Sequence, residues 1–343
     1  MTGGQRATAA LCAGLALLLL SACGGDDATA ERDGTGQETP DDVTFALSWL
    51  PVAEAAGWYS AWDQGWFEEK GIDAEIVRGF GSGDTAKRVA TGETDFGIVD
   101  MSALVPLRLN EDIPVLTIAS YYPEPPHAVI FRTGEGIEEP GDLEGRSIAC
   151  SANNANMLMF PAFAAATGID EDSIDWVLTD PGANNSLFAS GETDATCDFI
   201  TTIPILEGMA DDEFDYFSYA EHGVEGYSQT LVTTETMIEE RPDLVERFLR
   251  AALRGAEFAV EQPQEAVGIL ASHEPEQDHD ILLEAWQMTL DNELMSNDDT
   301  ERHGLGHISE ERMQATFDTL VEAGALDVGD YTAEDLYTTD FLP

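Results

Sequence analysis

The sequence predicts an α/β protein built from two similar lobes. One observation is an internal repeat: residues 83–95 (GDTAKRVATGETD) and 182–194 (GANNSLFASGETD) share a glycine, a short helix, a second glycine where the helix stops, and a polar turn before a strand. The other is the alternation of strand and helix patterns along the chain. The repeat distance is too long for a solenoid and suits two lobes of about 100 residues each. The alternative is a chance match in a chain rich in glycine, alanine and acidic residues.

The N-terminal residues predict export. Residues 1–22 hold one positive residue, Arg6, and then an apolar run from 7 to 20, which is typical of a secretory leader and too short for a comfortable membrane span. The sequence Leu-Ser-Ala-Cys that ends at Cys23 resembles the bacterial lipobox, in which cleavage leaves an acylated cysteine as the first residue. We therefore expect Cys23 to anchor the protein by lipid at the extracytoplasmic face of the cell membrane. The alternative is an ordinary leader with an incidental cysteine.

Composition and proline positions predict the domain boundaries. Residues 23–42 contain almost nothing apolar and should form an acidic flexible linker. The first lobe is expected at 43–126 and 228–343 and the second at 127–227, so the chain would cross between the lobes twice. After the leader no apolar stretch is long enough to span a bilayer.

Runs of β-branched and aromatic residues predict the strands, and apolar residues at helical spacing predict the helices. In the first lobe these patterns predict a strand at 43–47, a helix at 53–64, a turn at 66–70, a strand at 74–77, a helix capped by Asp84, a strand at 95–99, a helix at 102–109, a strand at 115–120 and a stiff connector at 121–126. After the second lobe, the patterns predict a returning strand at 230–234 and, from Pro242 onward, helices separated by Pro263 and Pro275, the first with an apolar stripe of Leu244, Phe248, Leu249, Ala252 and Phe258.

The charge is extreme, with 67 acidic residues against 15 basic ones and a net charge of −52. Nucleic acid is excluded as a partner, because its binding needs a basic surface that displaces counterions. In ordinary salt such an acidic surface repels itself, whereas in molar salt the Debye length falls to about 3 Å. We therefore interpret the charge as an adaptation to a saline environment.

Two cysteines remain after the leader and the lipidated residue are set aside. Cys150 and Cys197 each end a predicted strand of the second lobe. An exported protein can hold a disulfide, but neighbouring parallel strands rarely supply the required geometry. We expect two buried thiols, with a disulfide as the alternative.

Several segments together resemble the substrate-binding proteins of ABC importers for nitrate, sulfonates, taurine and thiamine-pyrimidine precursors. The matching segments are 45–77 (FALSWLPVAEAAGWYSAWDQGWFEEKGIDAEIV), 81–84 (GSGD), 92–97 (GETDFG), 137–148 (IEEPGDLEGRSI), 227–233 (YSQTLVT) and 241–249 (RPDLVERFL). The resemblance covers about residues 43–275. It implies a periplasmic-binding-protein type II fold with two crossover strands, closing on a small solute. It further implies an ABC permease and its ATPase subunit as partners, a monomeric state, and no cofactor.

A relative of these binding proteins is an enzyme, thiamine pyrimidine synthase, which uses pyridoxal phosphate and histidine. The positions that would carry its lysine and reactive histidine are Val99 and Ala103 here, and the segment 223–227, where it is rich in cysteine, has none. Without that lysine no Schiff base can form at this place. The sequence also lacks G-x-S-x-G and H-E-x-x-H motifs, and the glycines beside His303 and His307 disfavour a helix-mounted metal pair. We expect no enzymatic activity and no metal site.

Ligands of open α/β sheets lie beyond the carboxyl ends of the strands. This rule selects candidate residues after the strands and at the crossings: Ser48, Trp49, Ser82, Gly83, Asp84 and Asp100 in the first lobe, Ser151, Asn153, Asn154, Asn156, Asn184 and Asp198 in the second, and Tyr121, Tyr122 and Tyr227 at the crossings. Some of them have a structural alternative: core packing for Trp49, helix capping for Asp100 and Asp198, and a capped turn for the asparagines.

The types of these residues indicate the solute. Aromatic walls with carboxylates and amides suit a planar, neutral or weakly basic nitrogen heterocycle, and a thiamine-pyrimidine-like compound is favoured. The alternative is a sulfonate or aromatic carboxylate, which free helix N-termini can hold without a lysine.

Overall fold

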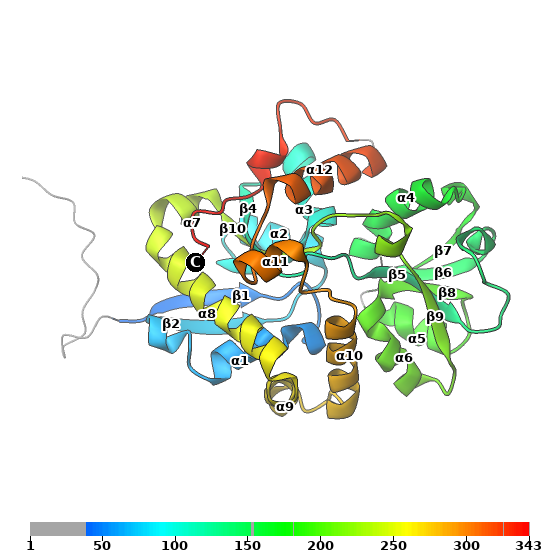
Figure 1. The fold of residues 1–343 in the computed structure, drawn as a ribbon, viewed down its shortest axis with the longest axis horizontal. Coiled ribbons are helices and arrows are strands. Elements are labelled where there is room, and N and C mark those ends of the chain that lie inside the picture. Colours follow the sequence, from blue (N-terminus) through cyan, green and yellow to red (C-terminus); the bar gives the residue numbers. More distant parts are fainter. Residues whose placement is uncertain (1–38, 152–153, 181, 325, 343) are drawn as a thin grey trace, which may run out of the picture. The chain divides into compact units, whose positions relative to one another are not determined.

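Two five-stranded mixed sheets organise the protein (Figure 1). The computed structural model describes residues 39–151, 154–180, 182–324 and 326–342, and from Pro40 onward they belong to one unit. The first sheet has the order β2(Ile72–Val77), β1(Asp41–Ala46), β3(Phe96–Asp100), β10(Gln229–Thr234) and β4(Val115–Ser120). The second has the order β7(Asp175–Thr179), β6(Ser147–Ser151), β8(Ala195–Phe199), β5(His127–Arg132) and β9(Phe214–Ser218). The α/β prediction is confirmed.

The two sheets have the same topology. In each, the first three strands in spatial order are parallel, and the fourth runs antiparallel to both of its neighbours. The repeat in the sequence maps onto equivalent places, α2–β3 in one sheet and α5–β8 in the other. Gly92 and Gly191 each follow the helix with a positive φ, of 72° and 79°. This left-handed conformation favours glycine and explains why both copies carry one.

The repeated aspartates perform the same task in each copy. The carboxylate of Asp95 accepts a hydrogen bond from the backbone N–H of Thr44, at 2.8 Å, and that of Asp194 accepts one from Ser147 N–H, at 2.8 Å. In return, the N–H groups of Asp95 and Asp194 donate to the carbonyls of Thr44 and Ser147. Each aspartate thereby links the start of its strand to the neighbouring parallel strand, which gives the repeat a structural cause.

Helices cover the sheets in the order expected for an α/β chain. They are α1(Ala56–Asp63), α2(Ser82–Ala90), α3(Met101–Glu111), α4(Ala155–Thr167), α5(Ala183–Ala189), α6(Ile203–Met209), α7(Glu235–Glu240), α8(Pro242–Glu261), α9(Pro263–His273), α10(His279–Asp291), α11(Asp298–His303) and α12(Glu310–Gly324). The predicted apolar stripe of α8 packs into the core, where the ring of Phe248 stacks on Phe96 with centroids 3.8 Å apart. In the described part of the chain, we find no helix long and apolar enough to cross a membrane.

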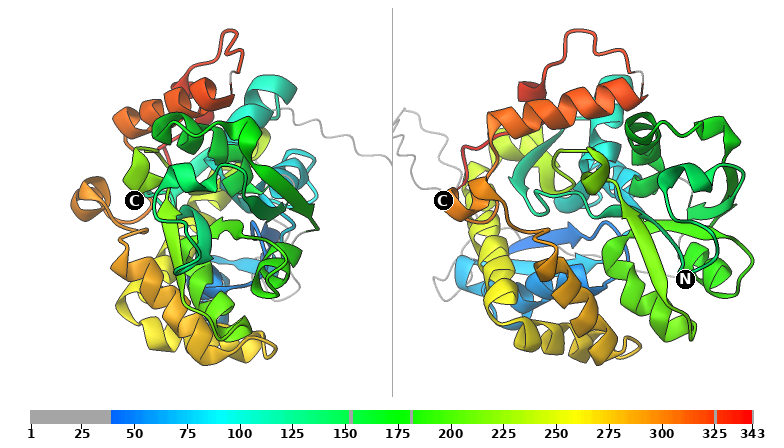
Figure 2. Two further views of the ribbon diagram at one scale, coloured as in Figure 1. Left: turned by 90° about the vertical axis from the view of Figure 1, so that its right-hand side faces the viewer. Right: turned by 45° about the vertical axis from the view of Figure 1, so that its right-hand side comes forward.

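The C-terminal helices contact elements of both sheets. Helix α10 packs against α9 and also against α6, while α12 packs against α3 and α4 (Figure 2). The sequence assigns the segment 228–343 to the first lobe. In the structure this segment also packs against helices of the second lobe. Between the sheets, the chain passes from β4 to β5 and returns from β9 to β10. These crossings are hydrogen-bonded to each other, since Tyr121 and Tyr122 both donate their N–H groups to Gln229 O.

Three local predictions are wrong. Strand β1 begins at Asp41, inside the predicted linker, because Asp41 pairs with Ile72 and with the side chains of Arg241 and Arg247. Asp84 is exposed and does not cap α2, whose N-cap is Gly81, because the helix starts earlier than predicted.

The third concerns the cysteines, which form a disulfide between β6 and β8. The parallel register places Ala149 beside Thr196, so the cysteines that follow are neighbours, with Cα atoms 5.3 Å apart. That separation is within the range that a disulfide spans.

Candidate functional site

A pocket of about 210 Å³ lies where loops from the two sheets meet. Its walls come from the loop after β1, the N-termini of α2 and α4, the start of α5, the end of β8, helix α6 and the first residue of β10. The lining residues are Ser48, Trp49, Leu50, Val52, Ala53, Glu54, Gly81, Ser82, Asn154, Ala155, Asn156, Gly182, Asn185, Asp198, Phe199, Thr201, Thr202, Ile205, Met209, Gln229, Gln277 and Ala285. Pockets between domains or at sheet ends are the usual small-molecule sites of α/β proteins.

The loop that carries Ser48 and Trp49 is held by backbone hydrogen bonds. Gly79 N–H donates to Trp49 O at 2.8 Å, and Gly81 N–H donates to Ser48 O at 2.9 Å. A Cβ atom at Gly79 would lie 2.2 Å from Leu47 O, so only glycine permits this close approach. Trp49 itself is partly buried and faces the pocket from a loop whose backbone does not depend on its side chain.

Glu54 is a pocket residue with a perturbed carboxyl group. It lies in a short 3-10 turn, Ala53–Ala55, before α1, and accepts a hydrogen bond from Ser48 Oγ at 3.2 Å. Burial raises the pKa of Glu54 to about 7, and the nearby charges of Asp198 and Asp100 act in the same direction, while the Ser48 hydrogen bond opposes them.

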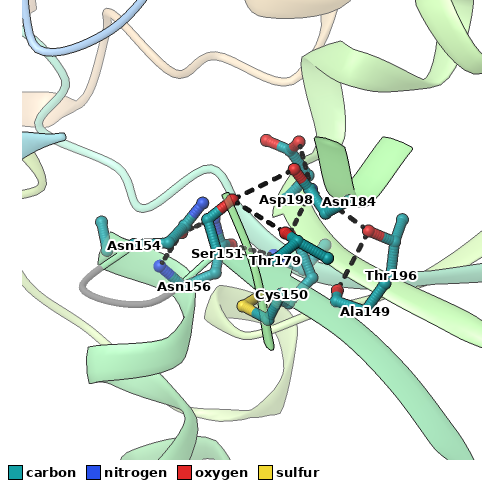
Figure 3. The surroundings of a disulfide bond; sticks show 12 residues. Ala149, Cys150, Ser151, Asn154, Asn156, Thr179, Asn184, Thr196 and Asp198 are labelled. Atoms are coloured by element: carbon teal, nitrogen blue, oxygen red, sulfur yellow. Dashed lines mark hydrogen bonds between the residues drawn. A yellow bond between two sulfur atoms is a disulfide. The ribbon is translucent and has the colours of Figure 1, made fainter. Parts of the chain in front are cut away.

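Asp198, near the end of β8, is a second carboxyl in the pocket and is partly buried. Its oxygens accept hydrogen bonds from Phe199 N–H at 2.8 Å, Asn185 Nδ2 at 3.0 Å and Asn184 Nδ2 at 3.3 Å. Burial raises its pKa, although these donors act against the shift. Figure 3 shows Asp198 and Asn184 near Ser151 and Thr179. Ser151 and Asp198 lie on β6 and β8, the strands that the disulfide joins, whereas Asn184 lies on α5 and Thr179 on β7.

Gln229 contributes an amide to the pocket. Its side chain is 2% exposed, and its Oε1 has no hydrogen-bond partner among the described residues. Lysine, arginine and histidine are all missing from the lining residues that the structure describes. The pocket thus presents hydrogen-bond acceptors from three elements and no fixed positive charge.

The structure brings together six of the candidates that sequence analysis selects. Those that line the pocket are Ser48, Trp49, Ser82, Asn154, Asn156 and Asp198. Two of them also cap or support helix α4: Asn154 Oδ1 accepts from Asn156 N–H at 2.7 Å, and Asn156 Oδ1 accepts from Ala128 N–H at 3.1 Å. Asn153 lies outside the described residues.

Other candidates lie behind the pocket wall. Ser151 and Asn184 are buried and support Asp198, whereas Tyr121 and Tyr122 stack on each other at the crossing, and the Tyr121 hydroxyl donates to Glu54 O at 2.6 Å. Gly83 and Asp84 lie in the first turn of α2 and do not line the pocket. Tyr227 lies away from it and accepts a hydrogen bond from Ser309 N–H.

Asp100 is used by the fold. It caps α3 by accepting from Ser102 N–H at 2.9 Å, accepts from Ser228 Oγ at 2.5 Å, and lies 3.3 Å from His127 Nε2. Burial would raise its pKa, but His127 and the hydroxyls outweigh burial, and the pKa is lowered. Asp100 is therefore a helix cap, as the structural alternative proposed. Its pair with His127 links β3 to β5 of the second sheet.

Sequence analysis missed Glu54, Asn185, Thr202 and Gln229. Asn185 and Thr202 could have been found from their nearness to Asn184 and Asp198 in the sequence. For Glu54 no such signal exists, because it follows Pro51 within a predicted helix and is one of many acidic residues. Gln229 starts the returning strand, one residue before the predicted strand.

The fold is that of the periplasmic binding proteins. An alkanesulfonate-binding protein from Xanthomonas axonopodis pv. citri, solved with MOPS, superposes with a TM-score of 0.70 over 88% of this chain and 99% of that one, at 12% identity. The family model described as NMT1/THI5 like matches residues 52–266, and the chain belongs to that family.

Relatives within reach of sequence comparison include two binding proteins and an enzyme. The chain is 28% identical to a formylaminopyrimidine-binding protein of Halalkalibacterium halodurans, over 80% of this chain and 82% of that protein. It is 24% identical to the riboflavin-binding protein RibY of Chloroflexus aurantiacus, over 96% of each chain. A 4-amino-5-hydroxymethyl-2-methylpyrimidine phosphate synthase of Legionella pneumophila is 24% identical, over 68% of this chain and 74% of the enzyme.

Proposed function

We propose that this protein is an extracytoplasmic solute-binding lipoprotein that delivers a small planar heterocycle, of the thiamine-pyrimidine kind, to an ABC importer. The observation that carries the proposal is the pocket, which residues from both sheets line and in which Trp49 and Phe199 accompany Glu54, Asp198 and Gln229. Aromatic rings suit the face of a planar solute, and the acceptors suit the N–H groups at its edge. The similarity to formylaminopyrimidine- and riboflavin-binding proteins supports a nitrogen heterocycle.

The acceptor groups disfavour the main alternative, a sulfonate or an aromatic carboxylate. The N-termini of α2 and α4 reach the pocket and could donate N–H groups to an anion. An anion there would also face the partly buried carboxyl groups of Asp198 and Glu54, where charge repulsion is less screened than in bulk water. The likeness to the alkanesulfonate-binding protein concerns the fold and does not decide the solute.

The synthase alternative has weaker support. Val99 and Ala103, the positions that would have to carry the enzyme's lysine and histidine, are buried in β3 and α3 and do not line the pocket. Among the described lining residues there is no amine that could form a Schiff base.

A panel of compounds tests the proposal on the mature protein. We expect 4-amino-5-hydroxymethyl-2-methylpyrimidine to raise the melting temperature and to bind with micromolar or better affinity, about −8 kcal/mol. MOPS and an aromatic carboxylate should give no shift, and pyridoxal phosphate should give no borohydride-reducible band. Binding of MOPS alone would establish the anion alternative, and reduction of an aldimine onto a specific lysine would restore the synthase.

The lipid anchor is tested separately. Replacing Cys23 with Ala should leave unprocessed or soluble protein, because the acyl chains that hold the mature protein at the membrane would be missing. Fractionation of membranes from cells that express the variant measures this. If the Cys23→Ala protein remained in the membrane fraction in its processed form, the anchor would not depend on this cysteine.

A further inference from the structure

Two partly buried carboxyl groups reach the pocket from different sheets. Glu54 comes from the segment after β1, and Asp198 comes from the end of β8. Their surroundings differ. Asp198 accepts hydrogen bonds from three donors, which lie on β8 and α5. Among the described residues, the Glu54 carboxyl accepts one hydrogen bond, from the Ser48 hydroxyl. Glu54 is therefore the less satisfied of the two.

The acidic surface does not explain Glu54. An exposed carboxylate is solvated at little cost, but Glu54 is partly buried and loses part of its hydration, which costs stability unless a positive group or several donors compensate. The titratable groups around Glu54 supply no such compensation. They are Asp198, Asp100, Tyr121 and Tyr122, and His127 lies beyond Asp100, to which it is already paired.

The unpartnered Oε1 of Gln229 is an independent sign that a donor is missing from the pocket. It is buried, lines the pocket and comes from β10, an element that carries neither carboxyl. A solute with N–H groups and a positive charge would supply the donor that Gln229 lacks and the positive partner that both carboxyl groups lack.

We propose that the pocket selects a cationic nitrogen heterocycle over its neutral analogue, and that Glu54 is the residue that recognises the charge. This rests on the proposed function, since it specifies the solute class of the same pocket. A cation beside Glu54 stabilises the carboxylate form. Where the free protein holds Glu54 protonated, binding therefore releases that proton to solvent, and the carboxylate pairs with the solute.

Compounds that share a ring and differ in charge test this proposal. The first set shares one ring: 4-amino-5-hydroxymethyl-2-methylpyrimidine is neutral, its 5-aminomethyl analogue carries an ammonium group, and its phosphate ester is an anion. The second is nicotinamide against 1-methylnicotinamide, whose ring is permanently positive. Calorimetry on the wild-type protein measures these affinities. In at least one set the cation should bind about tenfold or more tightly than its neutral partner, because a hydrogen bond between two charged groups is stronger than one between neutral groups.

The variant Glu54→Gln keeps the side chain's shape and removes its charge. It should lose the tenfold preference and bind the neutral compound about as the wild type does. Glu75→Gln is the matched control, because Glu75 is exposed on β2 in the same sheet and its loss changes the net charge equally. This control should keep the preference, and thermal melts of both variants should show that they are folded.

The pH dependence separates recognition by Glu54 from a general attraction of cations to an acidic protein. Below about pH 7 the affinity of the wild type for the cation should fall towards tenfold per pH unit, because one proton must leave Glu54, and Glu54→Gln should show no such fall. Equal binding of neutral and cationic partners, or tightest binding of the phosphate, would overturn this inference and leave a heterocycle-binding function standing. Failure of every compound in both sets to bind would overturn the proposed heterocycle function and this inference with it.

Discussion

The variant Trp49→Ala should bind the pyrimidine at least about a hundredfold more weakly than the wild type. Trp49 lines the pocket from the loop after β1 and is only partly buried by the protein, so a solute can cover its remaining surface. Stacking on an indole and burial of one of its faces contribute a few kcal/mol, and about 1.4 kcal/mol corresponds to tenfold in affinity. Titration calorimetry measures the affinity, and tryptophan emission should change on binding in the wild type.

The fold should survive this substitution. The loop is held through backbone groups, including the bond from Gly79 N–H to Trp49 O, which alanine retains. Trp62→Ala is a suitable control, since Trp62 is 40% exposed on α1 and lies outside the pocket lining. It should bind as the wild type does. Unchanged affinity in Trp49→Ala, with the fold intact, would mean that the solute site is elsewhere.

Replacing Cys150 and Cys197 together with alanine should lower the free energy of unfolding by about 4 kcal/mol. The disulfide closes a loop of 47 residues, and the loss of chain entropy in the unfolded state that such a loop imposes is of this order. Urea unfolding with and without reductant measures the effect. Reductant should lower the free energy of unfolding of the wild type. It should not change that of the alanine double variant, which serves as the control. A loss of less than about 1 kcal/mol would show that the bond contributes little.

The disulfide also bears on the pocket. Cys150 precedes Ser151 and Cys197 precedes Asp198, so the bond joins the strands whose next residues form the network around Asp198 (Figure 3). We expect the alanine pair to bind the solute more weakly as well, because Asp198 would lose part of the support that orients it.

Much of the fold could be predicted because it depends on short-range patterns. Side-chain periodicity marks strands such as β4, whose observed bounds equal the predicted ones, and the repeated glycine and aspartate mark equivalent turns in both sheets. The positions of Trp49 and Asp198 in the pocket follow from the same logic. Trp49 lies in the loop after β1 and Asp198 lies near the carboxyl end of β8, and the carboxyl ends of parallel strands face the ligand side of a sheet.

Long-range contacts decided the rest. Asp100 and Asp198 look alike in the sequence, yet His127, Ser102 and Ser228 occupy the carboxylate of Asp100, while Asp198 faces the pocket. Of these partners Ser102 is local, but His127 and Ser228 are distant along the chain, so no local pattern distinguishes the two aspartates.

The sequence by itself determined the α/β class, the internal duplication, the strand-end location of the pocket and the absence of the synthase lysine. Only the tertiary structure decided that Cys150 meets Cys197, because this depends on the register of two strands that pair across 47 residues. It also decided that Glu54, one acidic residue among 67, is partly buried in the same pocket as Asp198. Burial and proximity set the charge and the pKa of a carboxyl group, and both arise when separate elements pack together.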